Sequence, residues 1–161
     1  MSYVPLTPDN FKGAKNNIDE ALESLYEKGI NFDSIAVRGM SGALMGGVIA
    51  SEYDIPLILV RKKGARSHSR SSVETKSKVK KYIILDDLIE SGKTVVEIEK
   101  AIDIANGAKC VAIVLYDHQD GNVELDLPNR RAARQWEQSP VSNVPIFTRD
   151  GEVEVFGWDR D

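Results

Sequence analysis

Residues 83–94, IILDDLIESGKT, constrain the fold of this 161-residue chain more than any other segment. A short apolar run ends at two adjacent acids, Asp86 and Asp87, and a helix start follows. The helix opens on residues that can face an anion: Ser91, Gly92, Lys93 and Thr94. In an open parallel sheet, ligands bind beyond the carboxyl ends of the strands, and N–H groups at a helix start attract phosphate. The segment therefore predicts a phosphate-binding turn beside a pair of carboxylates.

Two alternatives compete with this interpretation. The sequence Gly92-Lys93-Thr94 also ends the loop that binds nucleoside triphosphates, but that motif requires a glycine five positions earlier. This chain has Asp87 there, and a carboxylate would repel phosphate, so the alternative fails on charge and on pattern. The second alternative is a solvated turn followed by an ordinary helix cap. The acid pair alone leaves it open, and the adjoining helix start weighs against it.

Apolar strand segments alternate with helical segments around this turn. Helical spacing of apolar residues predicts helices from about Thr7 to Gly29, from 43 to about 53, and from 94 to 105. Continuous apolar runs predict strands at 35–37, 56–60, 82–85 and 111–116. This alternation is typical of a parallel sheet covered on both faces. We expect one α/β domain over 1–161, with its core at about 9–116.

Two segments depart from the alternation. Residues 61–80 are rich in basic residues and serine and nearly lack apolar residues, so we expect a flexible loop there. Residues 117–161 are polar and poorly periodic, and we expect them to fold over the sheet as a subdomain, with 153–156 as a short strand.

Composition narrows the class of protein. A hydrophobic fraction of 42% and a charged fraction of 29% are typical of soluble globular chains. The net charge of -4 gives no bulk attraction to nucleic acid or anionic membranes, and no segment has the length and apolarity of a membrane span or a signal sequence. Cys110 is the only cysteine, which excludes an internal disulfide and fits a reducing cytoplasm.

The pattern of residues 82–94 resembles the signature of type I phosphoribosyltransferases: four apolar residues, two acids, two apolar residues, a variable position, then Ser/Thr-Gly-x-Thr. The resemblance implies a Rossmann-like parallel sheet flanked by helices, with a small hood at about 117–161 helped by residues 1–8. It also implies that Asp86 and Asp87 hold the ribose hydroxyls of phosphoribosyl pyrophosphate, directly or through Mg²⁺. The 5-phosphate would be held by Glu90, Ser91, Gly92, Lys93 and Thr94.

Basic residues follow the first two expected strands. The turn at 37–42 resembles the family's pyrophosphate loop, with Arg38 and Gly39 as contacts. Arg61 and Lys62 resemble the Arg-Lys that ends the second strand of adenine and orotate phosphoribosyltransferases. Cations at these positions can stabilise departing pyrophosphate. The alternative for each is a solvated basic turn.

The resemblance extends to candidate catalytic residues. Orotate enzymes carry Lys-x-His in the loop, and Arg66 and His68 offer a similar pair displaced by about one position. A loop that closes also excludes water from an oxocarbenium-like sugar. Glu90 resembles the aspartate that handles the base proton in 6-oxopurine enzymes, although the helix dipole would also favour an acid there. Asp159 resembles a late aspartate that meets a metal, which completes a candidate Mg²⁺ set with Asp86 and Asp87.

The base pocket is less defined. Four aromatic residues are candidates for stacking on the base, and each has hood core as its alternative role: Trp136, Phe147, Phe156 and Trp158. The 6-oxopurine enzymes carry a lysine just after the fourth strand, where this chain has Tyr116-Asp117-His118-Gln119.

Three functions fit this reading. The first is transfer of the 5-phosphoribosyl group from phosphoribosyl pyrophosphate to a nucleobase, with a purine favoured, which makes the chain a glycosyltransferase. The second is a non-catalytic regulator that binds phosphoribosyl pyrophosphate. The third is hydrolysis or pyrophosphorolysis of a nucleotide at the same site. Dimers are common in the family, so a homodimer is an expectation from the resemblance alone.

Overall fold

The computed structural model describes residues 7–62, 72–75, 78–118 and 121–157. In this part of the chain the main sheet has seven strands: β1 (Ser34–Arg38), β2 (Leu57–Val60), β3 (Val73–Glu74), β4 (Lys81–Asp86), β5 (Lys109–Leu115), β7 (Ile146–Thr148) and β8 (Gly151–Val153). Their order across the sheet is β3-β2-β1-β4-β5-β7-β8. Neighbouring strands from β2 to β7 run parallel, and the two outer pairs are antiparallel. The expected α/β class with a mostly parallel sheet is confirmed.

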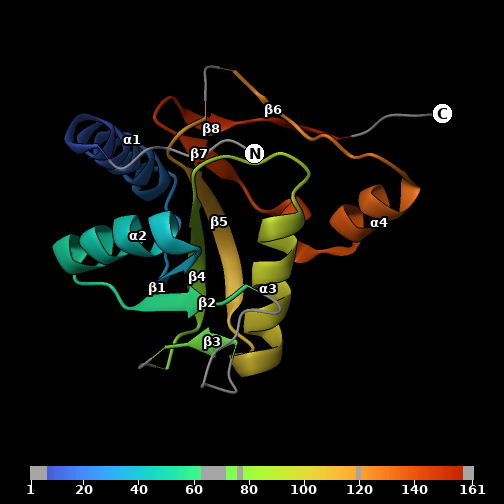
Figure 1. The fold of residues 1–161 in the computed structure, drawn as a ribbon, viewed down its shortest axis with the longest axis horizontal. Helices are drawn as coiled ribbons and strands as arrows, with labels where there is room; N and C mark the ends of the chain where they lie inside the picture. The colour runs from blue at the N-terminus through green and yellow to red at the C-terminus, as the bar shows by residue number, and fades with distance from the viewer. Residues whose placement is uncertain (1–6, 63–71, 76–77, 119–120, 158–161) are drawn as a thin grey trace.

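Helices cover both faces of this sheet (Figure 1). Helices α1 (Pro8–Glu27) and α2 (Met40–Tyr53) lie on one face, and α3 (Lys93–Asn106) lies on the other. Successive strand side chains point to opposite faces, so the strands divide between two cores. Those packed with α3 include Ala36, Ile58, Tyr82, Ile84 and Ile113. Those packed with α1 and α2 include Ile35, Val37, Ile83, Leu85 and Val114. None of the helices in these ranges is long and apolar enough to cross a membrane.

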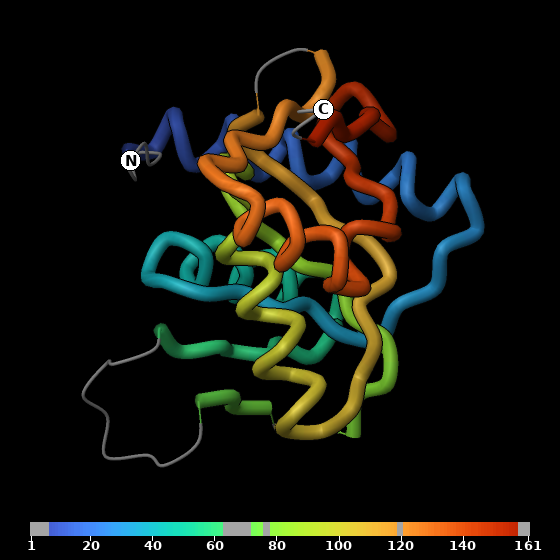
Figure 2. Tube along the Cα trace, turned by 90° about the vertical axis from the view of Figure 1, so that its right-hand side faces the viewer, coloured from blue at the N-terminus to red at the C-terminus, as the bar shows by residue number. Residues whose placement is uncertain are grey.

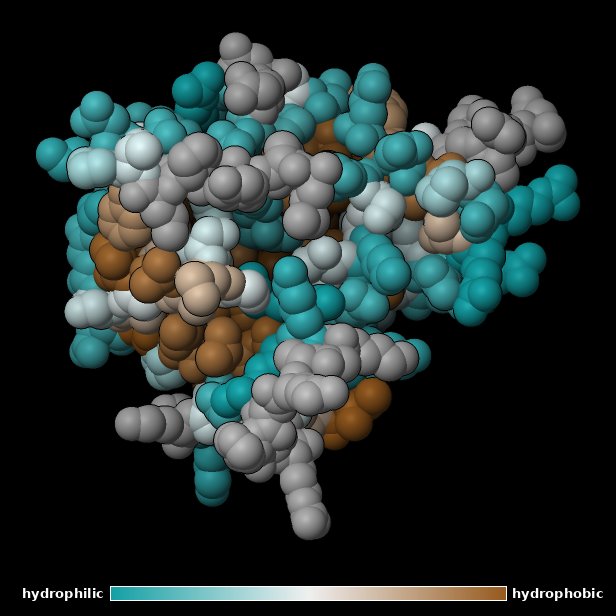
Figure 3. All heavy atoms as spheres, in the orientation of Figure 1, coloured by the Kyte–Doolittle hydropathy of each residue, from teal (hydrophilic) through white to brown (hydrophobic). Residues whose placement is uncertain are grey.

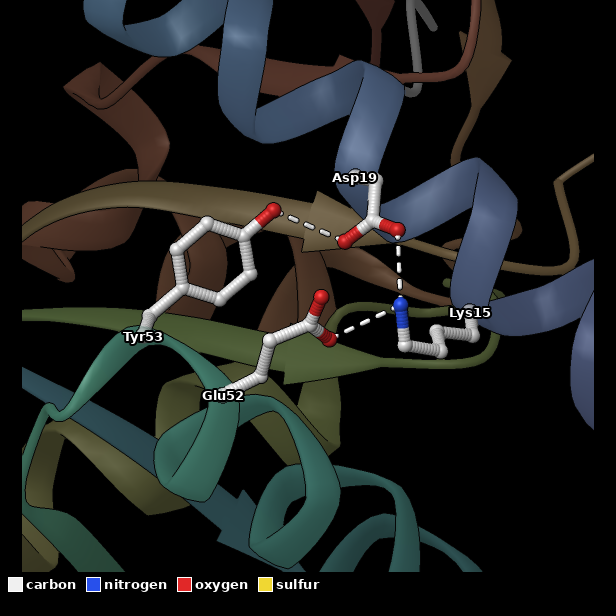
Figure 4. Close-up of polar contacts among 4 residues, drawn as sticks. All are labelled: Lys15, Asp19, Glu52 and Tyr53. Carbon is white, nitrogen blue, oxygen red and sulfur yellow. Dashed lines mark hydrogen bonds and ion pairs between the residues drawn. The ribbon is translucent and has the colours of Figure 1, made fainter.

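Polar contacts and one close approach fix α1 and α2 against each other and the sheet. The Lys15 Nζ atom lies 3.0 Å from Asp19 Oδ2 and 2.8 Å from Glu52 Oε2, while the Tyr53 hydroxyl donates to Asp19 Oδ1 at 2.8 Å (Figure 4). In α2, a Cβ atom on Gly46 would lie 2.6 Å from Val37 Cγ1 of β1. The helix can therefore approach the sheet this closely only because glycine occupies that position.

The last strands of the chain lie beside the first helix. Helix α1 packs against β7 and β8, and Phe147 of β7 is fully buried in the core that contains Ile18 and Leu22 of α1. An ion pair of 3.4 Å joins Lys28 Nζ to Glu152 Oε1 of β8. The main sheet thus extends well beyond residue 116, into the segment that was expected to form only a hood.

A smaller layer lies above the sheet edge. It contains a two-stranded parallel sheet of β6 (Val123–Glu124) and β9 (Val155–Phe156), and helix α4 (Arg130–Gln138), which the 3₁₀ turn η1 (Pro140–Asn143) follows. The short strand expected at 153–156 is confirmed only for Val155 and Phe156 in β9, because Val153 ends β8 in the main sheet and Glu154 belongs to neither strand. Within the 61–80 segment, β3 pairs with β2 and Val79 is buried, so those parts are ordered against the core.

Candidate active site

The acid pair lies at the end of β4, as the sequence predicts. The Asp87 N–H donates to Asp86 Oδ1 at 2.9 Å, and the Leu88 N–H donates to Asp87 Oδ1 at 2.7 Å. Burial, and then the neighbouring charge of Asp87, raises the pKa of Asp86 to about 7, although the nearby charge of Arg38 lowers it in part. Two oriented carboxylates that repel one another are suited to hydroxyl donors or to a cation.

The expected phosphate turn follows directly. Gly92 has φ 79° and ψ 0° and caps α3 without a side-chain hydrogen bond. Glycine adopts this left-handed conformation at little cost. The Val96 N–H donates to the Gly92 carbonyl at 3.0 Å, so the N–H groups before Val96 have no acceptor within the helix. The Lys93 N–H donates to Ser91 Oγ at 3.3 Å, and the side chains of Lys93 and Thr94 are exposed.

The end of β5 brings a third carboxylate to this edge. The Asp117 N–H donates to the Asp87 carbonyl at 2.8 Å, and the Tyr116 N–H donates to the Asp86 carbonyl at 3.1 Å. Burial and the charge of Asp87 raise the pKa of Asp117. Sequence reasoning noted Asp117 only as the place where a lysine is missing. Its position directly after a predicted strand is the signal that could have placed it beside Asp87, since parallel strands end at one edge.

The carboxylates fit the expected Mg²⁺. In the described ranges, no group of three or more His, Cys, Asp or Glu side chains is arranged to hold a metal ion by itself. Mg²⁺ is commonly held by one or two carboxylates together with substrate phosphates and water, and Asp86 and Asp87 supply such a pair. The third expected ligand, Asp159, lies outside the described residues.

Arg38 ends β1, and its guanidinium is directed towards α3. Its Nη1 atom lies 2.8 Å from Glu97 Oε1, and its side chain is 13% exposed. The Nε atom is buried and makes no hydrogen bond within the described part of the chain. Gly39 follows with φ 85° and caps α2. A contact between Arg38 or Gly39 and pyrophosphate stays a prediction, and the structure gives Arg38 a partner that the sequence did not indicate.

The other expected site residues are distributed more widely. Arg61 follows β2 and forms an ion pair with Glu74 of β3, and Lys62 is exposed. Glu90 is exposed, and its carbonyl accepts a hydrogen bond of 2.8 Å from the Asp126 N–H. The loop residues Arg66 and His68 lie outside the described residues.

The aromatic candidates for stacking separate clearly. Phe147 is fully buried beneath α1, so it is a core residue and does not line a base pocket. Trp136 is 7% exposed and packs against Gly92. Phe156 of β9 is half exposed and thus accessible to a ligand. Trp158 lies outside the described residues.

Comparison with known proteins agrees with this arrangement. A family model for the phosphoribosyl transferase domain matches residues 9–139. The chain belongs to this family. An orotate phosphoribosyltransferase from Campylobacter jejuni is 28% identical over 139 residues, which cover 86% of this chain and 66% of that protein. The corresponding enzyme from Sulfurovum is 32% identical over 94 residues, or 58% of this chain and 46% of that protein. This chain thus spans about half to two thirds of the length of these relatives.

Solved structures share the fold of this family member. Orotate phosphoribosyltransferase from Aeropyrum pernix has a TM-score of 0.56 at 13% identity, covering 90% of this chain and 76% of that one. Adenine phosphoribosyltransferase from Trypanosoma brucei, solved with AMP, pyrophosphate and ribose-5-phosphate, has a TM-score of 0.55 at 17% identity, covering 96% of this chain and 67% of that one. The expected type I phosphoribosyltransferase fold is confirmed.

Proposed function

We propose that this chain transfers the 5-phosphoribosyl group from phosphoribosyl pyrophosphate to a nucleobase and releases pyrophosphate. The observation that carries the proposal is the meeting of two features at one sheet edge. The Asp86–Asp87 pair ends β4, and the left-handed Gly92 opens α3 six residues after Asp86. The first can accept hydrogen bonds from ribose hydroxyls, and the second can present N–H groups to a phosphate.

Each part has a distinct role in this proposal. Asp86 and Asp87 bind the ribose hydroxyls, and residues 90–94 bind the 5-phosphate. Mg²⁺, when bound, would neutralise charge on the pyrophosphate that leaves. Arg38, Arg61 and Lys62 supply further positive charge towards that group. Glu90 accepts a proton from the base, and Arg66 and His68 act from the loop.

The charges at the site favour a neutral purine over an anionic base. The charge of Asp117 lies close to that of Asp87, and exposed Glu90 and Asp126 are two further acids joined by a backbone hydrogen bond in the segments that adjoin the phosphate turn. Orotate carries a carboxylate, and like charges at close range repel. The orotate relatives argue for the opposite specificity, so both bases belong in the test.

A panel of adenine, hypoxanthine, guanine, xanthine, uracil and orotate tests the proposal. Each base is incubated with the protein and phosphoribosyl pyrophosphate, with Mg²⁺ or with EDTA, and pyrophosphate release is measured. We expect release with at least one purine, dependent on Mg²⁺, and loss of release in Asp87→Asn. Tight binding of phosphoribosyl pyrophosphate without release by any base would support the regulatory alternative. Breakdown of a nucleotide when no free base has been added would support the third function, hydrolysis or pyrophosphorolysis.

A homodimer through α2 belongs to the same proposal. Three apolar residues spaced four apart form an exposed stripe on this helix: Met40 (81% exposed), Leu44 (50%) and Val48 (36%). Apolar side chains gather over α2 on the face seen in Figure 3. Exposed apolar patches commonly mark protein interfaces. We expect light scattering to give a dimer that Leu44→Asp converts to a monomer and that Ile104→Asp, at an exposed residue of α3, leaves intact. A monomeric parent protein would contradict this part.

A further inference from the structure

Trp136 lies in direct contact with the phosphate turn. A Cβ atom built on Gly92 would lie 2.5 Å from Cε3 and 2.8 Å from Cζ3 of the indole, closer than any ordinary carbon contact. The edge of the ring therefore occupies the space that a side chain at position 92 would fill. Trp136 belongs to α4, 44 positions further along the sequence, so neither local helix capping nor strand pairing accounts for the contact.

A second contact joins the same two segments. The Asp126 N–H donates to the carbonyl of Glu90 at 2.8 Å. Leu125 and Leu127, on either side of Asp126, are buried in the core that also contains Trp136. Residues 126–136 thus hold the turn at Glu90 by a backbone hydrogen bond and at Gly92 by an aromatic ring.

Helix α4 is itself anchored for this contact. The Asn129 side chain caps its first turn by accepting from the Ala132 N–H at 2.9 Å. Ala133 and Trp136 are its buried residues, and Arg130, Arg131 and Arg134 are exposed. Figure 2 shows α4 lying over the end of α3 at which the phosphate turn begins. The buried face of α4 is therefore small, and Trp136 is its large side chain.

We propose that Trp136 is a positioning residue for the 5-phosphate, and this inference rests on the function proposed above. Glycine populates many backbone conformations, and the N–H groups at the start of α3 face a phosphate only when Gly92 adopts the left-handed one. The indole edge holds Gly92 there. Without it the turn samples other conformations, and the apparent dissociation constant rises in inverse proportion to the fraction of molecules that stays competent.

Titration with ribose 5-phosphate, followed by calorimetry, measures this effect. We expect Trp136→Leu to weaken binding by about tenfold, as a fall of the competent fraction to about a tenth requires. Trp136→Phe, which keeps an aromatic ring, should recover part of the affinity. Val141→Ala is the matched control, because Val141 is buried in the same core but lies in η1. It should lower the melting temperature and leave ribose 5-phosphate affinity within about twofold, because it leaves the competent fraction unchanged.

Steady-state kinetics separate positioning from general destabilisation. For Trp136→Leu, KM for phosphoribosyl pyrophosphate should rise about as much as the dissociation constant, while kcat changes little, because a lost competent fraction acts on binding. Gly92→Ala should also weaken binding, and it should do so less in the Trp136→Leu background, where the methyl group no longer meets the ring. Additive effects of the two substitutions would overturn the proposal.

Two further outcomes are decisive. Native affinity for ribose 5-phosphate in both Trp136→Leu and Trp136→Phe would overturn the positioning role and leave the proposed function standing. If Trp136→Leu does not fold, Trp136→Phe carries the same test, alone and combined with Gly92→Ala. A parent protein that binds neither ribose 5-phosphate nor phosphoribosyl pyrophosphate would overturn both the proposed function and the positioning role.

Discussion

The backbone N–H of Asp87 donates a hydrogen bond of 2.9 Å to the carboxylate of Asp86 at the end of β4. The two acids thus lie side by side where the strand ends, and each carboxylate accepts a hydrogen bond from the next backbone N–H. Burial of Asp86, and then the neighbouring charge of Asp87, makes ionisation of Asp86 costly, which raises its pKa to about 7. Groups arranged for ligand binding at the expense of stability are common at functional sites.

Asp86→Asn should stabilise the protein at neutral pH. An acid whose pKa is higher in the folded protein than in the unfolded chain ionises first in the unfolded chain. Its destabilising effect is absent below about pH 4, grows towards pH 7 and is constant above. Asparagine removes the charge and keeps the Oδ1 acceptor. We expect the free energy of unfolding to rise by about 4 kcal/mol at pH 8, which is about three pKa units at about 1.36 kcal/mol each, and to be unchanged at pH 4.

Urea unfolding at both pH values checks this expectation. Asp103→Asn, at an exposed position of α3, is the control and should change stability by less than about 0.5 kcal/mol at either pH. A gain from Asp86→Asn that did not depend on pH would contradict the assignment.

Arg38→Gln should move this pH dependence upwards. The charge of Arg38 lowers the pKa of Asp86, so its removal should raise that pKa above about 7. Glutamine can still hydrogen bond to Glu97. The measurement compares Arg38→Gln with Arg38→Gln/Asp86→Asn from pH 5 to 9. Between the parent and Asp86→Asn, the difference in free energy of unfolding should stop growing above about pH 7. Between Arg38→Gln and the double variant, it should keep growing at higher pH.

Two adjacent glycines of α2 should respond oppositely to alanine. A methyl group on Gly46 would lie 2.6 Å from Val37 Cγ1 and 3.1 Å from Leu57 Cδ1, whereas one on Gly47 would meet nothing within 4 Å. Gly46→Ala should therefore destabilise by about 1–3 kcal/mol through overpacking. Gly47→Ala should stabilise by about 0.5–1 kcal/mol through helix propensity. Equal changes at both positions in chemical denaturation would mean that α2 lies farther from the sheet.

Binding of phosphoribosyl pyrophosphate to the folded protein should raise its free energy of unfolding with the logarithm of the ligand excess. At about a hundredfold excess over its dissociation constant, the free energy of unfolding should rise by about 2.7 kcal/mol. Asp87→Asn should lose most of this gain, because one hydroxyl acceptor becomes a weaker neutral group. EDTA should reduce the gain of the parent protein. A gain that survived both changes would place the ligand away from the acid pair.

The candidate site was predictable where its residues are adjacent in sequence. Asp86, Asp87 and Gly92 belong to one strand-turn-helix unit, and strand ends and helix starts have local signals in apolar runs and small residues. The end of α3 was predictable for the same reason, since Gly107 has φ 75° and caps the helix.

Contacts between segments far apart in the sequence leave no local pattern of apolar runs or small residues from which they could be predicted. The Arg38–Glu97 pair joins residues 59 apart, and Trp136 reaches Gly92 across 44 positions. Strands of two or three residues, such as β7 and β9, are too short for a period to show. Helix α4 was missed because Ala133 and Trp136 are its only buried residues in the described chain.

The packing of α1 against β7 and β8 also sets the order in which this chain can fold. The helix is made first, but Phe147 is synthesised about 120 residues after α1 ends, which is roughly ten seconds at ordinary rates of translation. During that interval the side of α1 that packs against β7 and β8 stays uncovered, although α2 and β5 can already pack on the helix. Chains that end before residue 146 should therefore leave α1 open to protease. Chains that extend past residue 153 and are free to fold should protect it. The main sheet is therefore completed only when β7 and β8, which are made long after α1, pack against that first helix.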